Sequence, residues 1–128
     1  GNLANGVTSS SWWHQATRYK GVGVWPTTED FYKEFVAQQK SDPDYVHASC
    51  AATVVVLQDA IERAGSTDKK KVRDALAKTD VSTFYGPIKF SANGMNLARD
   101  LPIIQVQDRQ IKVLAPSDIK NGEMSLFK

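Results

Sequence analysis

The stretch SDPDYVHASCAATVVVLQDAIERAGS, residues 41–66, decides most of the fold. It predicts one long helix over residues 44–64, because Gly65 can adopt the left-handed conformation that ends helices. Small and bulky apolar side chains together cover much of the circumference of this helix. Such a wide apolar arc is typical of a helix that is buried on more than one side.

The start of this helix and its two neighbours carry capping signals. Pro43 is expected in the first turn, where its missing N–H costs nothing, with Ser41 or Asp42 as the cap. Upstream, Thr27 and Asp30 resemble a capping box and predict a helix that starts there. Downstream, residues 66–68 cap a third helix that runs to about residue 78.

Alternating patterns on both sides of the helices predict strands. Residues 5–13 indicate a short strand, and residues 85–90 a second one before the turn signal of residues 91–94. Residues 103–114 predict a β-hairpin with 107–110 between its arms. This order of elements belongs to the α/β or α+β classes, but it offers more apolar helix surface than so few strands can cover.

Composition excludes several classes of protein. The chain has 128 residues, 41% of them apolar, and its 16 Lys and Arg against 14 Asp and Glu give a net charge of +2. The positive charges form no stripe, so nucleic acid is not an expected partner. The single Cys50 excludes an internal disulfide framework, and we expect it to pack inertly in the long helix.

No catalytic or metal-binding constellation emerges from the spacing of the residues. The chain has no GxSxG, P-loop or GxGxxG motif, and His14 and His47 stand 33 positions apart without a nearby Cys or Asp cluster. We therefore expect no catalytic residues, no metal and no cofactor, and a small α/β enzyme is the least favoured function.

Two groups of residues are candidates for ligand binding. Trp12, Trp13 and His14 follow a strand end, where ligands bind in α/β proteins; flat rings can stack on a solute there, or else pack under the following loop. Tyr45 and His47 stand in the opening turn of the long helix, which favours anions. The alternative is that Tyr45 is a surface residue and His47 a satisfied helix residue.

At this point the order of the motifs resembles the C-terminal part of type I periplasmic solute-binding proteins, the receptors of ABC importers for branched-chain amino acids and related solutes. The residues that carry the likeness are Ala60-Ile61-Glu62-Arg63-Ala64-Gly65-Ser66 with Asp68, Val72-Arg73-Asp74-Ala75-Leu76, Tyr85-Gly86-Pro87-Ile88-Lys89-Phe90 and Asn93-Gly94. Residues 30–45 and the closing hairpin with Pro116 match as well. One departure is Ala51-Ala52-Thr53, where many relatives carry Tyr-Asp-Ala.

The resemblance implies a fold of two three-layer α/β/α lobes, of which this chain forms the C-terminal portion. Residues 1–14 would end the second-lobe sheet and cross over, and residues 15–26 would form a connecting loop. Residues 27–94 would then supply helices and a strand to the first lobe, and residues 95–128 would return to the second. The uncovered face of the long helix would lie against the N-terminal remainder of the same protein.

The resemblance also implies a binding function in which no covalent bond is made or broken. Such a receptor captures an amino acid or a related carboxylate with an apolar or aromatic body between hinged lobes, and presents it to a membrane permease. It implies a periplasmic or other extracytoplasmic location, with a signal peptide upstream of this chain. A ligand-sensing regulatory domain on the same fold is the alternative.

Overall fold

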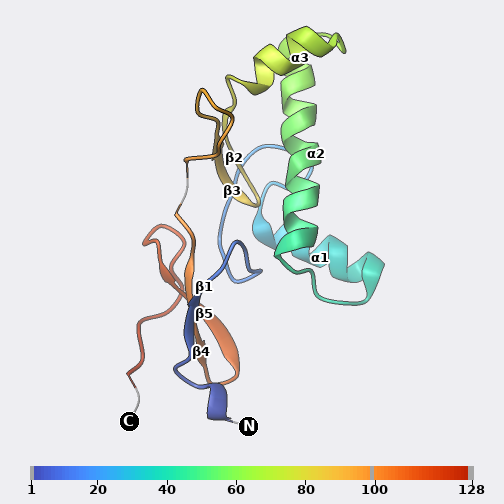
Figure 1. Cartoon of the computed structure of the whole chain (residues 1–128). Coiled ribbons are helices and arrows are strands. Elements are labelled where there is room, and N and C mark those ends of the chain that lie inside the picture. Colours follow the sequence, from blue (N-terminus) through green and yellow to red (C-terminus); the bar gives the residue numbers. More distant parts are fainter. Residues whose placement is uncertain (1, 99, 127–128) are drawn as a thin grey trace.

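A computed structural model describes residues 2–98 and 100–126. Residues 1, 99, 127 and 128 lie outside the described part. These four positions fall within the ranges 1–14 and 95–128, which were expected to belong to the second lobe. The chain forms an elongated molecule of two bodies (Figure 1). The helical body contains α1 (Thr28–Gln39), α2 (Tyr45–Ala64), α3 (Lys69–Leu76), β2 (Asp80–Thr83) and β3 (Gly86–Lys89). The sheet body contains η1 (Asn2–Ala4), β1 (Thr8–Ser10), β4 (Ile103–Gln107), β5 (Gln110–Ala115) and the tail up to residue 126.

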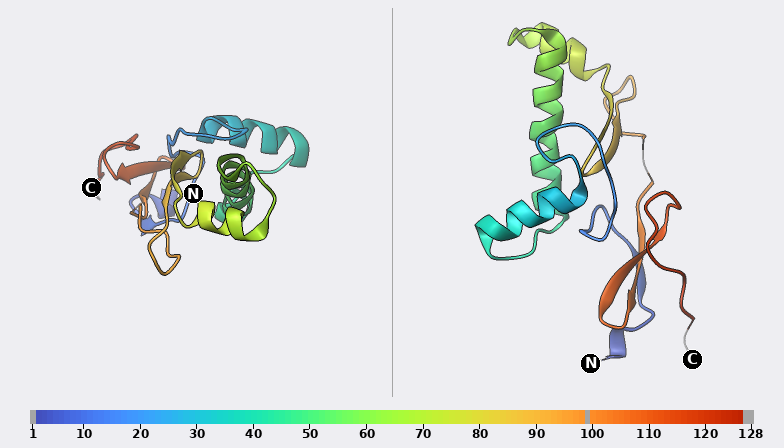
Figure 2. Two further views of the ribbon diagram at one scale, coloured as in Figure 1. Left: turned by 90° about the horizontal axis from the view of Figure 1, so that it is seen from above. Right: turned by 180° about the vertical axis from the view of Figure 1, so that it is seen from behind.

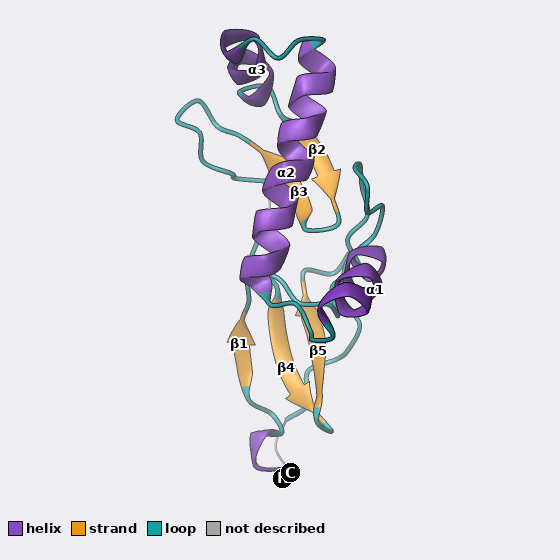
Figure 3. Ribbon diagram, turned by 90° about the vertical axis from the view of Figure 1, so that its right-hand side faces the viewer, coloured by secondary structure: helices purple, strands orange, loops and turns teal. Residues whose placement is uncertain are grey.

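The two bodies lie end to end. The three-stranded sheet lies beyond the N-terminal end of α2, whereas the β2–β3 hairpin lies beside that helix (Figure 3). From above, the helices gather to one side of the strands of the sheet body (Figure 2). The first and last described segments, η1 and the tail after β5, lie at the end of the molecule that is far from α3 (Figure 1).

Both sheets are antiparallel. The sheet body has the strand order β1-β4-β5, and β2 pairs with β3. The hairpin predicted over residues 103–114 is confirmed, and Asp108 and Arg109 form its turn with φ of 51° and 65°. Positive φ at two successive residues gives the turn a twist that matches the flanking strands.

Two strand predictions differ from the structure: the first strand is shorter than expected, and only one arm of the β2–β3 hairpin was predicted. The strand predicted over residues 5–13 extends only over Thr8–Ser10, since residues 5 and 6 form a turn and Trp13 is buried in the core of the helical body. β2 was not predicted, because its residues include only one aliphatic side chain, Val81. It pairs with β3, so the predicted strand 85–90 is the second arm of a hairpin.

The helix caps are mostly as predicted. Thr27 caps α1 and accepts a hydrogen bond from the Asp30 amide at 3.1 Å. Gly65 ends α2 with φ 55°. The predicted start of α2 was wrong: Asp44 is the cap, and Pro43 precedes the helix, because the Asp44 carboxylate itself accepts the second and third amides of the first turn.

Each body has its own core. Trp13, Phe31, Phe84 and three small residues of α2 form the core of the helical body, where Phe31 stacks on Phe84 with ring centroids 4.3 Å apart. Trp13 meets the Phe31 ring edge-on at 5.7 Å. The core of the sheet body contains Tyr19, Val113 and Ile119.

One crossing segment, residues 11–19, contributes to both cores. It sends Trp13 into the helical body, and Ala16 and Tyr19 into the sheet body. The loop that follows is fixed to the helical body, because the Val22 amide donates to the Ser82 carbonyl at 2.8 Å. A Cβ on Gly21 would lie 1.8 Å from that carbonyl oxygen, so this close approach requires glycine.

We predict that Trp13→Ala strongly destabilises the protein. Trp13 is 2% exposed, and truncating a buried tryptophan leaves a cavity that costs about 3–5 kcal/mol of unfolding free energy. Trp12 is the matched control, since it is 56% exposed and Trp12→Ala should cost less than half as much. Urea unfolding followed by circular dichroism measures both; equal losses in the two variants would contradict this packing.

Candidate functional site

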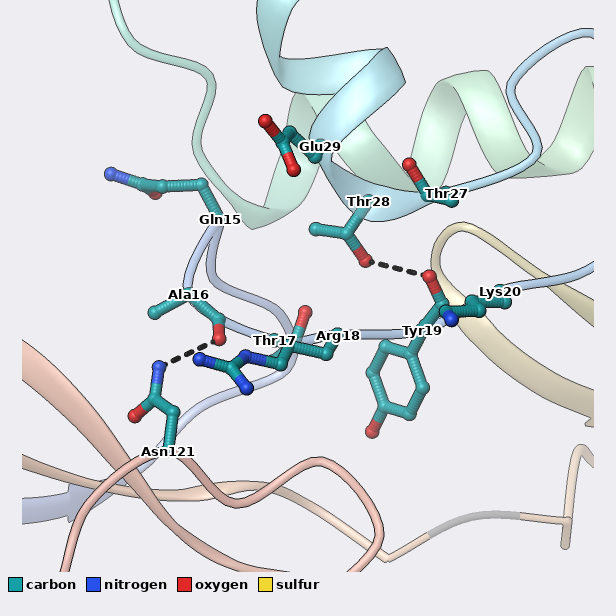
Figure 4. Close-up of a pocket in the computed structure, with 10 residues that line it drawn as sticks. All are labelled: Gln15, Ala16, Thr17, Arg18, Tyr19, Lys20, Thr27, Thr28, Glu29 and Asn121. Atoms are coloured by element: carbon teal, nitrogen blue, oxygen red, sulfur yellow. Dashed lines mark hydrogen bonds between the residues drawn. The ribbon is translucent and has the colours of Figure 1, made fainter.

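A cavity of about 620 Å³ lies at the junction of the two bodies (Figure 4). Its walls come from the crossing segment, the first turn of α1 and the tail after β5. The lining residues are Gln15, Ala16, Thr17, Arg18, Tyr19, Lys20, Thr27, Thr28, Glu29 and Asn121. The cavity is therefore shaped by segments that are distant in sequence and belong to different bodies.

Hydrogen bonds hold these walls together. The Asn121 side-chain amide donates to the Ala16 carbonyl at 3.0 Å, and its oxygen accepts from the Val113 amide at 2.7 Å. On the opposite wall the Thr28 hydroxyl donates to the Phe84 carbonyl at 2.8 Å. Thr28 is 1% exposed, so this wall is anchored in the helical body.

The cavity offers charges of both signs. Arg18 on the crossing segment and Lys20 directly after it carry positive charge, and Glu29 carries negative charge at the start of α1. Glu29 pairs with Lys33 at 2.5 Å, and the hydrogen bond raises the pKa of that lysine. A small molecule that carries a carboxylate and an ammonium group meets complementary charges here.

The two tryptophans predicted as ligand contacts have different environments. Trp13 is buried in the core and its indole Nε1 donates to the Phe84 carbonyl at 3.4 Å, which is the packing role left open in the sequence. Trp12 is more than half exposed at the junction. Of the two, only Trp12 offers a ring face to a solute.

His14 is half-buried between the two bodies. Its ring Nδ1 accepts a hydrogen bond from the Ala16 amide at 3.0 Å. Burial lowers the pKa of His14, and the nearby Asp42 carboxylate opposes this shift without overcoming it. The neutral form of the ring is therefore favoured at pH 7. Its Nδ1 already accepts a hydrogen bond within the turn that His14 begins.

Tyr45 and His47 lie in the first turn of α2, as expected. Tyr45 is 48% exposed. The His47 ring completes a capping box with Asp44, whose pKa is lowered mainly by the hydrogen bond from the His47 backbone amide. The ring also meets Phe35 edge-on at 5.0 Å, which is the satisfied helix role considered as the alternative.

His47 also lines a second cavity, of about 300 Å³, between α1 and α2. Cys50 lines this cavity too and is exposed, so the described residues do not bury its side chain as expected. The other residues of the lining include Phe31 and Phe35 of α1. A helical pattern alone does not show which apolar positions face a neighbour.

The five predicted residues therefore do not line the larger cavity. Sequence reasoning missed Arg18, Glu29 and Asn121, which do. Arg18 and Glu29 stand on either side of a glycine-containing loop that returns on itself through the Lys20–Thr27 bridge. Asn121 meets Ala16 across 105 positions, and no local pattern indicates such a contact.

Two features are absent from residues 2–98 and 100–126. None of the helices in this part of the chain is long and apolar enough to cross a membrane. Over residues 2–98 and 100–126, no three His, Cys, Asp or Glu side chains are grouped so that they can hold a metal ion.

Comparisons with known proteins agree with the fold. A family model described as periplasmic binding protein matches residues 1–110. The crystal structure of a leucine-binding protein, LivK, from Thermotoga maritima superposes with a TM-score of 0.64 at 23% sequence identity, covering 93% of this chain. The chain spans 33% of the length of that protein.

These matches confirm the resemblance and the fold class predicted from the sequence. The family is described as one of binding proteins, which agrees with the expectation of a binding protein rather than an enzyme. The match extends over most of the 128 residues, so this chain belongs to the periplasmic binding protein family.

Proposed function

We propose that this chain is the C-terminal part of an extracytoplasmic receptor that captures an amino acid or a related small carboxylate between two hinged lobes. The observation that carries the proposal is the cavity between the helical body and the sheet body, which presents Arg18 and Glu29 to one space. Closure of two bodies around a solute at such a junction is a common way for binding proteins to work.

The lobe assignment is part of this proposal. Residues 27–94 would belong to the first lobe and residues 95–128, with 1–14, to the second; residues 15–26 would connect them. Support comes from the separate cores of the two bodies, because each body can then move without disrupting the packing of the other. Trp12, His14, Tyr45 and His47 remain predicted contacts near the cleft.

The wider context follows from the same proposal. The receptor would carry a signal peptide, act in the periplasm or another extracytoplasmic space, and present its solute to the membrane permease of an ABC importer. A ligand-sensing regulatory domain would use the same closure to signal. An export signal in the gene favours transport, whereas a fused cytoplasmic domain favours sensing.

We predict that Arg18→Ala weakens solute binding by the protein that contains this chain. A charged hydrogen bond contributes about 1.5–3 kcal/mol, which corresponds to roughly tenfold to hundredfold in affinity. Calorimetric titration with the amino acids and short carboxylates that bind the unaltered protein gives the affinities. Arg73→Ala is the control, because Arg73 pairs with Asp74 on α3, at the far end of the molecule.

If Arg18→Ala and Arg73→Ala bind every solute equally well, the cavity at the junction is not the solute site. If no amino acid or carboxylate binds the unaltered protein, the proposed solute class is wrong. Loss of affinity for carboxylates, with uncharged analogues unaffected, would assign the carboxylate contact to Arg18.

Part of the apolar surface of α2 borders a groove and is exposed to solvent in this chain. A groove of about 420 Å³ runs between α2 and the β2–β3 hairpin. It is lined mostly by apolar side chains, including Val56, Leu57, Ile88 and Phe90. Val54 and Leu57 are 65% and 44% exposed, which is unusual for aliphatic residues near the middle of a long helix.

We infer that the remainder of the same protein fills this groove. The matched leucine-binding protein is about three times as long as this chain, so most of its fold has no counterpart here. An apolar groove of this size, bordered by exposed aliphatic residues, is what a sheet or helix from the remainder would bury.

We predict that Leu57→Asp destabilises the complete protein much more than Gln58→Asp, which loses only an exposed hydrogen bond to Glu62 and places a like charge one helical turn from it. Both positions are exposed on α2 of this chain and both variants gain the same charge, but only Leu57 lines the groove. Burying leucine contributes about 1.5–3 kcal/mol, and a buried aspartate adds a desolvation cost. Equal melting temperatures for the two variants of the complete protein would show that nothing covers this face.

A further inference from the structure

The turn at residues 14–17 stands between the anchors of the two bodies. On one side Trp13 is buried in the helical core, and on the other Ala16 and Tyr19 belong to the core of the sheet body. The chain must turn between these two anchors. A change in the conformation of this turn would therefore change the position of one body relative to the other. It would also move the cavity walls, which include the residues from Gln15 onward.

His14 closes this turn with both its backbone and its side chain. The His14 carbonyl accepts from the Thr17 amide at 2.9 Å and from the Thr17 hydroxyl at 2.7 Å. The ring Nδ1 accepts from the Ala16 amide at 3.0 Å. Thr17 is 2% exposed and His14, Gln15 and Ala16 are half-buried, so the turn is partly shielded from solvent.

The bond to Nδ1 depends on the charge of the ring. A neutral imidazole has one nitrogen that accepts a hydrogen bond, whereas both nitrogens of an imidazolium are donors. A proton on Nδ1 would face the Ala16 N–H directly, which removes the bond and replaces it with repulsion between two donors.

We propose that His14 is a pH-sensitive latch at the junction: its neutral ring holds the 14–17 turn closed, and its protonation releases the turn. His14 is thus a positioning residue for the cavity rather than a group that needs a solute to be satisfied. The inference rests on the hydrogen bonds of this chain alone and is independent of the proposed function.

The charged surroundings of His14 decide in which direction acid acts. Asp42, in the loop between α1 and α2, favours the protonated ring, and this carboxylate also accepts a hydrogen bond from the Tyr32 hydroxyl at 2.8 Å. Burial disfavours the protonated ring more strongly, so the pKa of His14 lies below its ordinary value of 6.5. A released turn that exposes the ring binds the proton more tightly than the closed turn does.

Acid lowers the stability of the closed turn. Above the ordinary pKa the ring is neutral in both states, and the closed turn has its full stability. As the pH falls below about 6.5, the open state takes up a proton that the closed state resists, so the closed turn loses stability. The loss levels off once the pH is below the lowered pKa of the closed state.

We expect acid to release the Ala16 amide in the natural protein that contains this chain, without any solute. Between about pH 8 and about pH 5, NMR should show the Ala16 amide shift following the titration of the His14 ring. Hydrogen exchange of that amide, corrected for intrinsic rates, should lose its protection over the same range. At the upper end, ¹⁵N shifts should report a neutral His14 ring with its proton on Nε2.

Three variants separate this latch from a merely structural role. His14→Asn keeps a side-chain acceptor for the Ala16 amide but does not titrate, so protection should persist and lose its pH dependence. His14→Ala should lose protection at every pH. His47→Asn alters the other histidine and should leave the Ala16 response unchanged.

Three results would overturn the proposal. The first is an Nδ1-protonated neutral tautomer of His14, which needs only the unaltered protein and so does not depend on the variants folding. The second is an Ala16 amide that ignores the titration of the ring. The third is an identical pH response in His14→Asn and the unaltered protein.

Discussion

The structure depends on one short segment that is buried in two cores. Trp13 packs against Phe31 and Phe84 in the helical body, and Tyr19 packs against Val113 and Ile119 in the sheet body. The chain between them has no freedom to slide, because displacing either ring would open a cavity in a core. The cavity at the junction, the closed turn at His14 and the relative placement of the bodies all follow from this double anchoring.

The second constraint is the breadth of the apolar surface of α2. One face packs on Trp13 and Phe84, and a second borders the groove along the β2–β3 hairpin. Val54 and Leu57 extend that surface and are exposed to solvent. A helix that is apolar over such an arc is stable in a larger assembly of elements, which agrees with the length of the matched leucine-binding protein, about three times that of this chain.

Local signals in the sequence predicted what depends on neighbouring residues. The caps at Thr27 and Gly65 and the hairpin through Asp108 were predictable, because each is determined within a few positions. The family resemblance held for the same reason, since it rests on the order of such local motifs. β2 was missed because its short run has a single aliphatic residue and is held by its partner strand.

The candidate site was harder to predict, because it is assembled by contacts that are distant in sequence. The pattern around Trp12 and Trp13 indicated an aromatic cluster but not that only Trp13 would be buried. Asn121 reaches Ala16 from the far end of the chain, and Arg18 and Glu29 meet at the cavity through a loop closed by backbone pairing. Only the folded arrangement shows these residues as one site.

We propose that a solute binds in the cavity where the crossing segment joins the two bodies. Amide shift mapping of the natural protein during titration with its best-binding amino acid or carboxylate tests this most directly. We expect saturable shifts in residues 15–20 and at Asn121 together, with smaller ones at Trp12 and Tyr45, and none in α3. Saturable binding whose shifts avoid both the crossing segment and the tail would contradict it.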